Sequence, residues 1–466
     1  NRYRFAVEIV LAIKRACGDS FPVSLRYSVV SKTKGFRQGA LPGEDYTEVG
    51  RDMEESEKAA KYLQDAGYDC LNCDNGTYDA WYWAHPPVYM PENCNLADVE
   101  HIKQFVDIPV ICAGRLDPRT AAESVAAGKL DGAGFARPFL ADPAWVTKLM
   151  EDREDDIRPC ILCHNGCFNM CHYKGVPNDQ DLSDSLHLAR CAVNAEMMQF
   201  GKHFIRKTEH PKTVHIVGGG IGGMEAARVL ALRGHHPVIH EKSGVLGGTF
   251  IPASAESYKG KLRDLLAWYR RQMEKLGVTV RLNEEIRDLS VFGDEPVLVA
   301  TGAKPRLLKQ VAGYEKMVEA CDYLNGTPVG ETVAVIGGGL TGCEIAYELA
   351  LQGKKPILVE MKDDLISQKG VCLANSSYLR EWFAWKQVPV YLETTLKKVK
   401  DGGIVCADKN GKTWEIPCDS VISCAGYVPD PVTEGGRGVV AIGDCRRVGN
   451  LRSVIWGAYE AAMDIG

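Results

Sequence analysis

The sequence predicts an α/β protein in which half of a (β/α)8 TIM barrel is followed by a cysteine-rich segment and two nested Rossmann-like domains. Three observations lead to this fold class. Short apolar strands alternate with amphipathic helices over the first 150 residues, a pattern that predicts parallel strands with helical crossovers. A group of cysteines follows. Two glycine-rich loops, each between a strand and a helix, come after the cysteines.

The first 150 residues contain four predicted strands and five predicted helices. The strands are 22–30, 68–73, 109–112 and 132–136, and the helices are 1–17, 49–66, 97–106, 118–127 and 143–150. A closed (β/α)8 barrel needs eight strands. We therefore expect the N-terminal half of the barrel, about 100–200 residues, to be missing from this sequence. An open α/β half-sheet is the alternative.

The ends of three predicted strands carry a candidate FMN site. Gly114 and Arg115 follow the third strand, and Ala136 and Arg137 follow the fourth. Barrel phosphate sites are built from the last two strand-to-helix loops, where glycine permits close backbone approach and arginine supplies charge. Arg26 closes the triplet Ser24-Leu25-Arg26 of the first predicted strand and is expected over the same barrel mouth, where it would stabilise negative charge on a reduced isoalloxazine. The alternative for each arginine is a surface ion pair.

An aromatic run at 78–87, rich in proline, lies between the second and third of these strands. Its prolines exclude a core strand, and its place in the chain puts it at the catalytic face of the barrel. It is either a packed aromatic lid or a wall of the substrate pocket, with Tyr82 or His85 as proton donor. Cys70 and Cys73, three apart on a strand, face opposite sides and are expected to pack in the barrel.

Four cysteines with metal-ligand spacing follow the half-barrel. Cys160, Cys163 and Cys167 form a Cys-x2-Cys-x3-Cys run, and Cys191 lies further on. Iron–sulfur clusters are typically held by four thiolates, although zinc accepts the same ligands. The nucleotide-binding features on either side favour iron and sulfur. Cys171 is the alternative to Cys167 as third ligand.

The first glycine-rich loop predicts a dinucleotide-binding site. Gly218, Gly220 and Gly223 stand between an apolar strand and a helix, and such glycines permit a tight turn, close approach to pyrophosphate and close helix packing. Glu241 ends the next strand, where an acid can bind ribose hydroxyls.

The arrangement recurs with Gly337, Gly339 and Gly342, followed by Glu360. An acid at this position accepts from an unphosphorylated ribose and repels a 2′-phosphate, so NADH is preferred over NADPH. The neighbouring Lys362 weakens that preference.

A third feature, Gly443-Asp444, precedes the last predicted helix. In flavoproteins with two dinucleotide folds, such a pair holds FAD groups. We therefore expect the second glycine unit to be inserted in an FAD domain. The predicted domains are 1–150 for the FMN half-barrel, 151–205 for the cluster, 206–325 and 416–466 for FAD, and 326–415 for NAD(P)H.

Composition excludes several classes of partner. The chain has 466 residues and a net charge of −6, so neither nucleic acid nor an anionic membrane is an expected partner. No apolar run approaches the ~20 residues of a membrane span, and the N-terminus is no signal peptide. Seventeen cysteines in such a chain indicate reduced thiols and metal ligation. We expect a soluble, cytoplasmic homo-oligomer.

Taken together, these motifs resemble the NADH:flavin oxidoreductase (old yellow enzyme) family, in its iron–sulfur branch. The opening Asn-Arg-Tyr-Arg-Phe, the Ala-Arg-Pro-Phe at 136–139, the cysteine spacing, the Cys-Ala-Val-Asn at 191–194 and both glycine loops match in order. The resemblance implies FMN in the barrel, one [4Fe-4S] cluster and FAD. It departs from the family at the 168–190 insertion, and His85 corresponds only loosely to a substrate-loop histidine.

The resemblance also implies a reaction. We expect an NADH-dependent ene-reductase that passes electrons from NADH through FAD, the cluster and FMN to the C=C of a small unsaturated carbonyl substrate, namely an enoate, enone or enoyl thioester. The alternatives are an amine dehydrogenase of the trimethylamine dehydrogenase type and an electron-transfer subunit that feeds a partner protein. The second glycine loop with Glu360 argues against the amine dehydrogenase, which does not need bound NADH.

Overall fold

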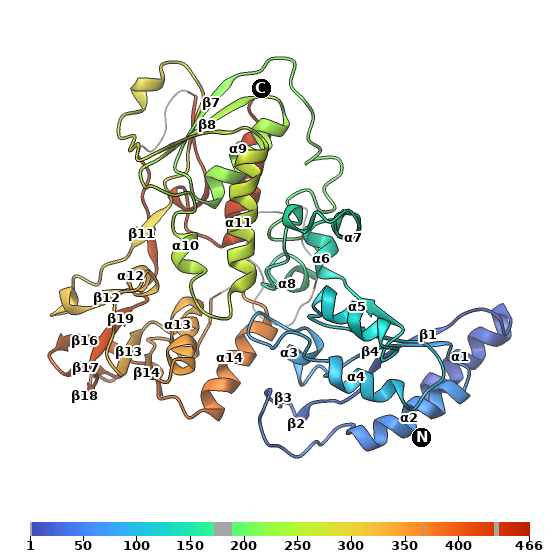
Figure 1. The fold of residues 1–466 in the computed structure, drawn as a ribbon. Coiled ribbons are helices and arrows are strands. Elements are labelled where there is room, and N and C mark those ends of the chain that lie inside the picture. Colours follow the sequence, from blue (N-terminus) through green and yellow to red (C-terminus); the bar gives the residue numbers. More distant parts are fainter. Residues whose placement is uncertain (1, 172–188, 369, 433–437) are drawn as a thin grey trace. The chain divides into compact units, whose positions relative to one another are not determined.

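The computed structural model describes residues 2–171, 189–368, 370–432 and 438–466. They divide into two compact units, which we describe separately. Unit 1 comprises Asn1–Ala136 with Leu373–Trp382, and unit 2 comprises Arg137–Cys372 with Phe383–Gly466. Figure 1 labels the helices and strands of both.

Unit 1 is built on a parallel sheet of four strands in the order β1-β4-β5-β6. These are β1 (Ser24–Ser28), β4 (Cys70–Asp74), β5 (Val110–Ala113) and β6 (Gly132–Gly134). The four predicted strands are thus confirmed, in sequence order. A closed barrel needs eight parallel strands. Closure of this four-stranded sheet into a barrel therefore stays a prediction.

The helices of unit 1 begin where the sequence supplies caps. Asp52 accepts a hydrogen bond from the Glu55 main-chain N–H (2.8 Å) at the start of α2, and Asp117 does the same for Thr120 (2.8 Å) at α5. An acidic cap satisfies an orphan helix N–H and favours the helix dipole. The helices are α1 (Arg4–Cys17), α2 (Met53–Asp65), α4 (Leu96–Lys103) and α5 (Pro118–Ala126).

Three further elements of unit 1 were not predicted. A hairpin, β2 (Thr33–Gly35) with β3 (Gln38–Gly39), follows β1. The aromatic run contains a short helix, α3 (Trp81–Ala84). The first ten residues of α14 (Leu373–Trp385), far away in sequence, also belong to this unit.

Unit 2 contains two parallel five-stranded sheets. The first has the order β21-β10-β7-β8-β9 and the second β12-β19-β13-β14-β15. The first comprises β7 (Thr213–Val217), β8 (His236–Glu241), β9 (Thr279–Leu282), β10 (Val297–Val299) and β21 (Val439–Ala441). The second comprises β12 (Val318–Glu319), β13 (Thr332–Ile336), β14 (Lys355–Val359), β15 (Val390–Tyr391) and β19 (Ser420–Ser423). Since β21 follows the whole second sheet in sequence, the second fold is nested in the first.

Two smaller sheets complete the strands. β11 (Ala303–Pro305) pairs antiparallel with β20 (Tyr427–Pro429) at the two crossings between the folds. An antiparallel meander follows β15, made of β16 (Thr395–Lys400), β17 (Gly403–Ala407) and β18 (Thr413–Pro417). The helices of unit 2 outside α14 are α6 (Arg137–Ala141), α7 (Trp145–Met150), α8 (Phe168–Cys171), α9 (Ile221–Leu232), α10 (Phe250–Ala253), α11 (Gly260–Lys275), α12 (Ala320–Leu324), α13 (Leu340–Leu351) and α15 (Leu451–Met463).

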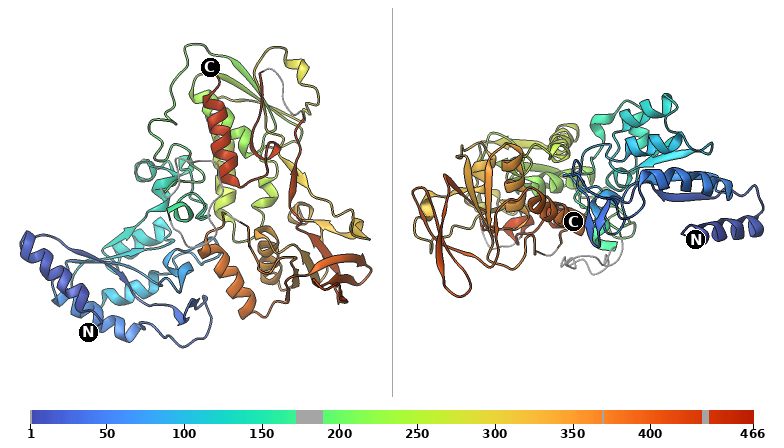
Figure 2. Two further views of the ribbon diagram at one scale, coloured as in Figure 1. Left: turned by 180° about the vertical axis from the view of Figure 1, so that it is seen from behind. Right: turned by 90° about the horizontal axis from the view of Figure 1, so that it is seen from below.

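The largest hydrophobic core joins the cysteine-rich segment to the first of these sheets. α9 contacts both α11 and α15, and Figure 2 shows α15 in red from behind. Ile161, Cys191 and Val193 are buried in the same cluster as Met224 of α9 and Trp456 of α15. Apolar burial of this kind stabilises by roughly 25 cal/mol per Å², so the segment is fixed to this sheet. In the described part of the chain no helix has the length and apolarity needed to cross a membrane.

Candidate functional site

The first glycine loop has a shape that only glycine allows. Gly218 has a φ of 111°, and a Cβ there would lie 2.4 Å from the Ala300 carbonyl oxygen. A Cβ on Gly223 would lie 2.0 Å from the Gly218 oxygen, whereas a Cβ on Gly220 meets nothing within 4 Å. The outer two glycines therefore close the turn against the sheet. The middle one leaves space at the N-terminus of α9, where helix N–H groups favour an anion.

Glu241 is held against this loop. Its Oε2 accepts a hydrogen bond from the Gly219 N–H (2.7 Å), and its Oε1 accepts from the Ser243 N–H (2.8 Å). The side chain is buried. The carboxylate is thus oriented at the end of β8, beside the loop, as a ribose-binding acid requires.

The second glycine loop repeats this geometry. Gly337 has a φ of 110°, with a Cβ position 2.6 Å from the Cys424 oxygen, and a Cβ on Gly342 would lie 1.9 Å from the Gly337 oxygen. Glu360 accepts from the Gly338 N–H (2.6 Å) and the Lys362 N–H (2.8 Å). At Gly339, the Cβ position meets only Gln368 Oε1, at 3.5 Å.

The Gly443-Asp444 pair lies between β21 and α15. Asp444 Oδ1 accepts from the Gly449 N–H (3.0 Å), and Asn450 caps α15 through the Ser453 N–H (3.1 Å). Burial raises the pKa of Asp444, and the Gly449 hydrogen bond partly opposes that rise. An oriented, half-buried carboxylate before a helix is suited to binding hydroxyl groups of a ligand.

The four predicted metal ligands line one pocket, of about 310 Å³ of atom-free space partly open to solvent: Cys160, Cys163, Cys167 and Cys191. Among the described residues, no three Cys, His, Asp or Glu side chains are arranged to hold one metal ion. The Cys171 side chain and most of the 168–190 insertion lie outside the described residues.

Burial favours the neutral, protonated form of three of the thiols in this pocket. Burial raises the pKa of Cys191 to about 12 and that of Cys167 to about 11, and places the pKa of Cys163 well above its usual value. Thiolates are the metal-binding form, so binding displaces their protons. The Arg137 guanidinium opposes the rise at Cys167.

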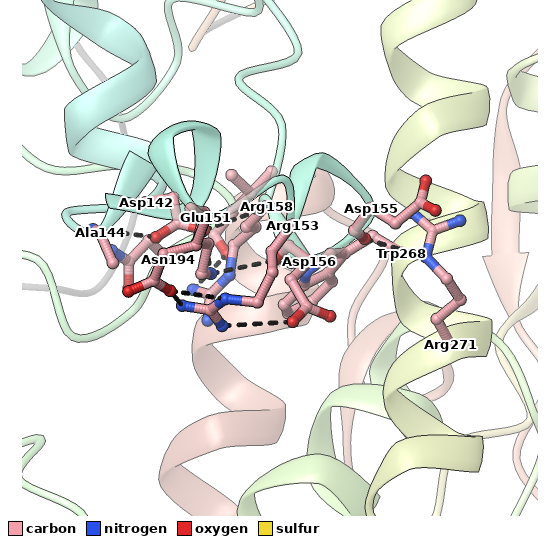
Figure 3. Close-up of polar contacts among 12 residues, drawn as sticks. Asp142, Ala144, Glu151, Arg153, Asp155, Asp156, Arg158, Asn194, Trp268 and Arg271 are labelled. Atoms are coloured by element: carbon pink, nitrogen blue, oxygen red, sulfur yellow. Dashed lines mark hydrogen bonds and ion pairs between the residues drawn. The ribbon is translucent and has the colours of Figure 1, made fainter. Parts of the chain in front are cut away.

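The chain entering the pocket is fastened to α11, as Figure 3 shows. Trp268 Nε1 donates to the Asp156 carbonyl (3.0 Å), and Arg271 Nε donates to the Asp155 carbonyl (2.9 Å). Arg158 Nη1 donates to the Val193 carbonyl (3.1 Å), two residues beyond Cys191. The first two bonds tie the start of the cysteine-rich segment to α11, and the third ties the start of the segment to its end.

A second anchor comes from α15. The indole Nε1 of Trp456 donates to the Cys191 carbonyl (2.9 Å). One turn earlier, the fully buried Arg452 lies over the Trp456 ring, 4.9 Å from its centroid, and its Nη1 is 3.4 Å from Met170 Sδ. The sequence carried no signal for these two residues other than their helical spacing.

Two of the candidate FMN residues of unit 1, Gly114 and Arg115, directly follow β5, whereas Arg26 does not have the strand-end position that the sequence predicted. Arg26 lies within β1, donates to Asn72 Oδ1 (2.5 Å) and forms an ion pair with Asp74. Burial raises the pKa of Asp74 to about 6, against the lowering effect of Arg26. Gly114 has a φ of 107°, and Arg115 Nη1 donates to the Val88 carbonyl (2.7 Å).

The other two candidate FMN residues follow β6. Ala136 is exposed and is the last residue of the first segment of unit 1. Arg137 begins α6 in unit 2, lines the cysteine pocket, and its Nη1 lies 2.7 Å from His164 Nε2. Because the guanidinium can only donate, His164 Nε2 accepts in this contact. The FMN role of all five residues stays a prediction.

The aromatic run is packed against α14 within unit 1. Tyr82 is fully buried, and its hydroxyl donates to Glu381 Oε2 (2.8 Å). The Tyr378 ring meets Tyr82 edge-on and Tyr89 face-on, at 5.4 Å in each case. Burial, followed by the charge of Glu381, raises the pKa of Tyr82. His85 is half-buried and meets the Trp81 ring edge-on at 5.0 Å.

These contacts describe a packed aromatic cluster. They do not test Tyr82 or His85 as proton donors, and both assignments stay predictions. Sequence reasoning missed Tyr378 and Glu381 because they lie in another part of the chain, 299 residues beyond Tyr82 in the case of Glu381.

Comparison with known proteins identifies both halves of the chain. Residues 1–156 match the NADH:flavin oxidoreductase / NADH oxidase family, and residues 212–446 match the pyridine nucleotide-disulphide oxidoreductases. A cinnamate reductase of Clostridium sporogenes is 40% identical over 475 residues, covering 100% of this chain and 69% of that protein. An NADH oxidase of Thermoanaerobacter brockii is 30% identical over 483 residues, covering 100% and 70%.

A solved structure has the same fold. The complex of 2-naphthoyl-CoA reductase with 2-naphthoyl-CoA superposes with a TM-score of 0.84 at 26% identity, covering 100% of this chain and 68% of that one. The order of motifs found in the sequence is therefore the order of a known architecture.

Proposed function

Because the chain belongs to the NADH:flavin oxidoreductase family, in its iron–sulfur flavoenzyme branch, we propose that it reduces the C=C bond of an aryl-substituted enoate or enoyl thioester. It is an NADH-dependent flavin oxidoreductase that acts on C=C bonds. The proposal concerns its substrate, its cofactor set and the residues that hold each group.

The observation that carries the proposal is the repeated loop geometry. The second glycine loop with Glu360 reproduces the first with Glu241, down to the backbone N–H groups that each carboxylate accepts. Two complete dinucleotide sites in one unit suit a protein that takes a hydride from NADH onto a bound flavin. An enzyme that releases electrons to another protein does not need the second site.

The residues present fit the cofactors. FAD would be held by the first glycine loop and two acids, namely Gly218, Gly220, Gly223, Glu241 and Asp444. When bound, FMN and FAD supply hydride chemistry, and a [4Fe-4S] cluster supplies one-electron transfer.

The second loop would hold the nicotinamide dinucleotide. Gly339 leaves space at the start of α13, and Glu360 is held beside the loop, where it would accept from the ribose. A carboxylate there favours NADH over NADPH, because a 2′-phosphate would meet a like charge. The adjacent Lys362 is the residue that could offset this repulsion.

The four cysteines would hold the cluster. Their pocket shares a core with α9 and α15, which supports a cluster beside the FAD domain. Trp456 fixes the Cys191 backbone, and Arg158 fixes the Val193 backbone. Rigid ligands keep the cluster environment constant while electrons pass, one at a time.

The barrel portion would hold FMN and the substrate. The proposed FMN residues are Arg26, Gly114, Arg115, Ala136 and Arg137. When bound, FMN would supply the hydride for the β-carbon, and hydrogen-bond donors of the chain would stabilise the charge that develops on the carbonyl oxygen. Tyr82 and His85 are the proposed donors of the α-carbon proton.

The substrate class follows from two relatives. One is a cinnamate reductase and another is a reductase of 2-naphthoyl-CoA. Both names describe an aryl ring conjugated with a carboxyl-derived carbonyl. An aromatic-rich wall such as 78–87 suits a flat aryl group.

Anaerobic turnover tests the proposal. Purified full-length protein is assayed for iron, acid-labile sulfide, FMN and FAD, and then mixed with NADH and cinnamate or its thioester. We expect four irons per chain, both flavins, and NADH oxidation that is matched by loss of the alkene. A protein with zinc in place of iron, or one whose flavin is reduced by NADH without alkene loss, would contradict it.

A further inference from the structure

Among the described residues that line the cysteine pocket, two have polar side chains other than thiols: Arg137 and His164. Arg137 Nη1 lies 2.7 Å from His164 Nε2. His164 is only 1% exposed, and Arg137 is half-buried. Within this described lining, Arg137 is the one residue with a permanent positive charge. Both residues and the four cysteines belong to unit 2, so their arrangement does not depend on unit 1.

The backbone around His164 is held in place. The φ of His164 is 55°, a left-handed conformation that is uncommon for residues other than glycine. Its carbonyl accepts from the Asn169 N–H (2.9 Å) in α8. The side-chain Nδ2 of the next residue, Asn165, donates to the Gly370 carbonyl (2.8 Å). These contacts fix the turn from which the imidazole reaches Arg137.

The helix that begins with Arg137 is held against the same pocket. Leu140 of α6 lines the pocket, and its carbonyl accepts from Asn194 Nδ2 (3.0 Å), three residues beyond Cys191. The guanidinium of Arg137 can only donate, so His164 Nε2 accepts and its imidazole is neutral in this contact. His164 therefore supplies orientation to the guanidinium and adds no charge of its own.

A fixed positive charge beside these sulfurs favours negative charge on them. The Arg137 guanidinium lowers the pKa of Cys167 against the effect of burial. Charges in partly buried sites are screened by salt much less than exposed ones. One-electron reduction adds one negative charge to an iron–sulfur cluster, and its potential depends on the charges and hydrogen bonds around its sulfurs. A cation held at this position therefore favours the reduced form.

We propose that Arg137 raises the reduction potential of the cluster that the four cysteines hold, and that His164 is the positioning residue that keeps its guanidinium in the pocket. A higher potential favours transfer of one electron from the reduced flavin to the cluster, and no bond forms or breaks in that transfer. The inference rests on the proposed function, because it requires the cluster. It is separate from the FMN role proposed for Arg137, and the experiment distinguishes the two roles.

The test is a redox titration of the full-length holoenzyme with dithionite and mediators under anaerobic conditions. The EPR signal of the reduced cluster gives its midpoint potential without any turnover. Iron, acid-labile sulfide and FMN are measured for each protein. The variants are Arg137→Gln, Arg137→Lys, His164→Leu and His164→Gln. Arg287→Gln is the matched control, because the Arg287 side chain is 82% exposed and pairs with Glu285 (2.6 Å).

We expect Arg137→Gln to shift the one-electron equilibrium about tenfold toward the oxidised cluster, which corresponds to a fall of about 59 mV. Arg137→Lys keeps the charge and should restore most of the potential. His164→Leu removes the acceptor and should lower the potential by a smaller amount, whereas His164→Gln keeps an acceptor and should stay near wild type. Arg287→Gln should have no effect, because solvent screens an exposed charge.

Three results would overturn the inference. The first is an Arg137→Gln protein with full iron content and the wild-type midpoint potential. The second is an Arg137→Gln protein that loses FMN and keeps the midpoint, which would assign Arg137 to FMN alone. The third is loss of iron from both Arg137→Gln and His164→Leu, which would make the pair structural.

Two further measurements close the test. If only Arg137→Gln loses iron, the midpoint potential of His164→Leu decides, and an unchanged value there contradicts the inference. Iron and sulfide analysis of the wild-type protein identifies a failure of the proposed function separately. Without a cluster in the wild-type protein the proposed function fails first, and the inference fails with it.

Discussion

Replacing Gly223 by alanine should remove FAD from the protein through a backbone clash. The added Cβ would lie 2.0 Å from the Gly218 carbonyl oxygen, whereas carbon and oxygen atoms that are not bonded rarely approach within about 3 Å. The first turn of α9 must then move by about 1 Å against a packed sheet. Overpacking of this kind costs roughly 1–3 kcal/mol, and 2.7 kcal/mol corresponds to about 100-fold in affinity.

Two further variants separate the effect of the backbone clash from the effect of the loop in which it occurs. Gly220→Ala adds a Cβ that meets no atom of the described residues within 4 Å, so it should leave the apoprotein stable and still weaken FAD binding by filling the phosphate space. Gly342→Ala makes the same clash as Gly223→Ala, 1.9 Å from the Gly337 oxygen, in the second loop. It should spare FAD and weaken NADH binding.

The assay is FAD content after gel filtration, together with Tm of the apoprotein and the dependence of flavin reduction on NADH concentration. We expect Gly223→Ala to lose both FAD and thermal stability, and Gly220→Ala to lose FAD only. A Gly223→Ala protein with full FAD content and unchanged Tm would refute the reasoning. Equal loss of FAD in Gly342→Ala would refute the assignment of the two loops.

Three other predictions follow from the side chains. Because burial raises the pKa of Glu256 to about 7, the folded state favours its protonated form. Stability should therefore fall as pH rises from about 4.5 to 7, by about 3 kcal/mol at 1.36 kcal/mol per pKa unit; a Tm that falls equally in Glu256→Gln over this range would contradict this. Cys163→Ser should abolish iron and sulfide binding, measured by elemental analysis, while Cys70→Ser keeps both; retained iron in the first would exclude Cys163 as a ligand. Tyr82→Phe should lower kcat about 10²-fold or more if the hydroxyl is the proton donor, and Glu381→Gln should not; equal, small effects in steady-state assays would leave Tyr82 a packing residue.

Local features of the chain were predictable because their causes are local. The strand at 213–217 and its glycine loop follow from a short apolar run and from residues that must adopt positive φ. The four parallel strands of unit 1 follow from alternation with helices, and their observed bounds differ from the predicted ones by a few residues. Helix ends were set by caps such as Asp52 and Asp117, which shift a boundary by a turn or less.

Contacts between distant segments were not predictable. α14 belongs by sequence to the second fold of unit 2, yet its first ten residues pack with unit 1, where Glu381 meets Tyr82. The buried ion pair of Lys259 and Glu344 joins distant segments in the same way. In the sequence, Glu381, Lys259 and Glu344 look like ordinary surface charges. The residues next to them in the chain do not indicate which distant side chain each of them contacts.

By itself, the sequence determined the α/β class with its parallel strands, the two glycine loops and the spacing of the four cysteines. Periodicity, glycine positions and ligand spacing are properties of short stretches, so they can be recognised without coordinates. Only the tertiary structure decided that the cysteines line one pocket in the core of the first fold, that the aromatic run packs on α14, and that Glu256 is buried beside Lys259. Such placements depend on which surfaces become buried together, and that is settled by packing across the whole chain.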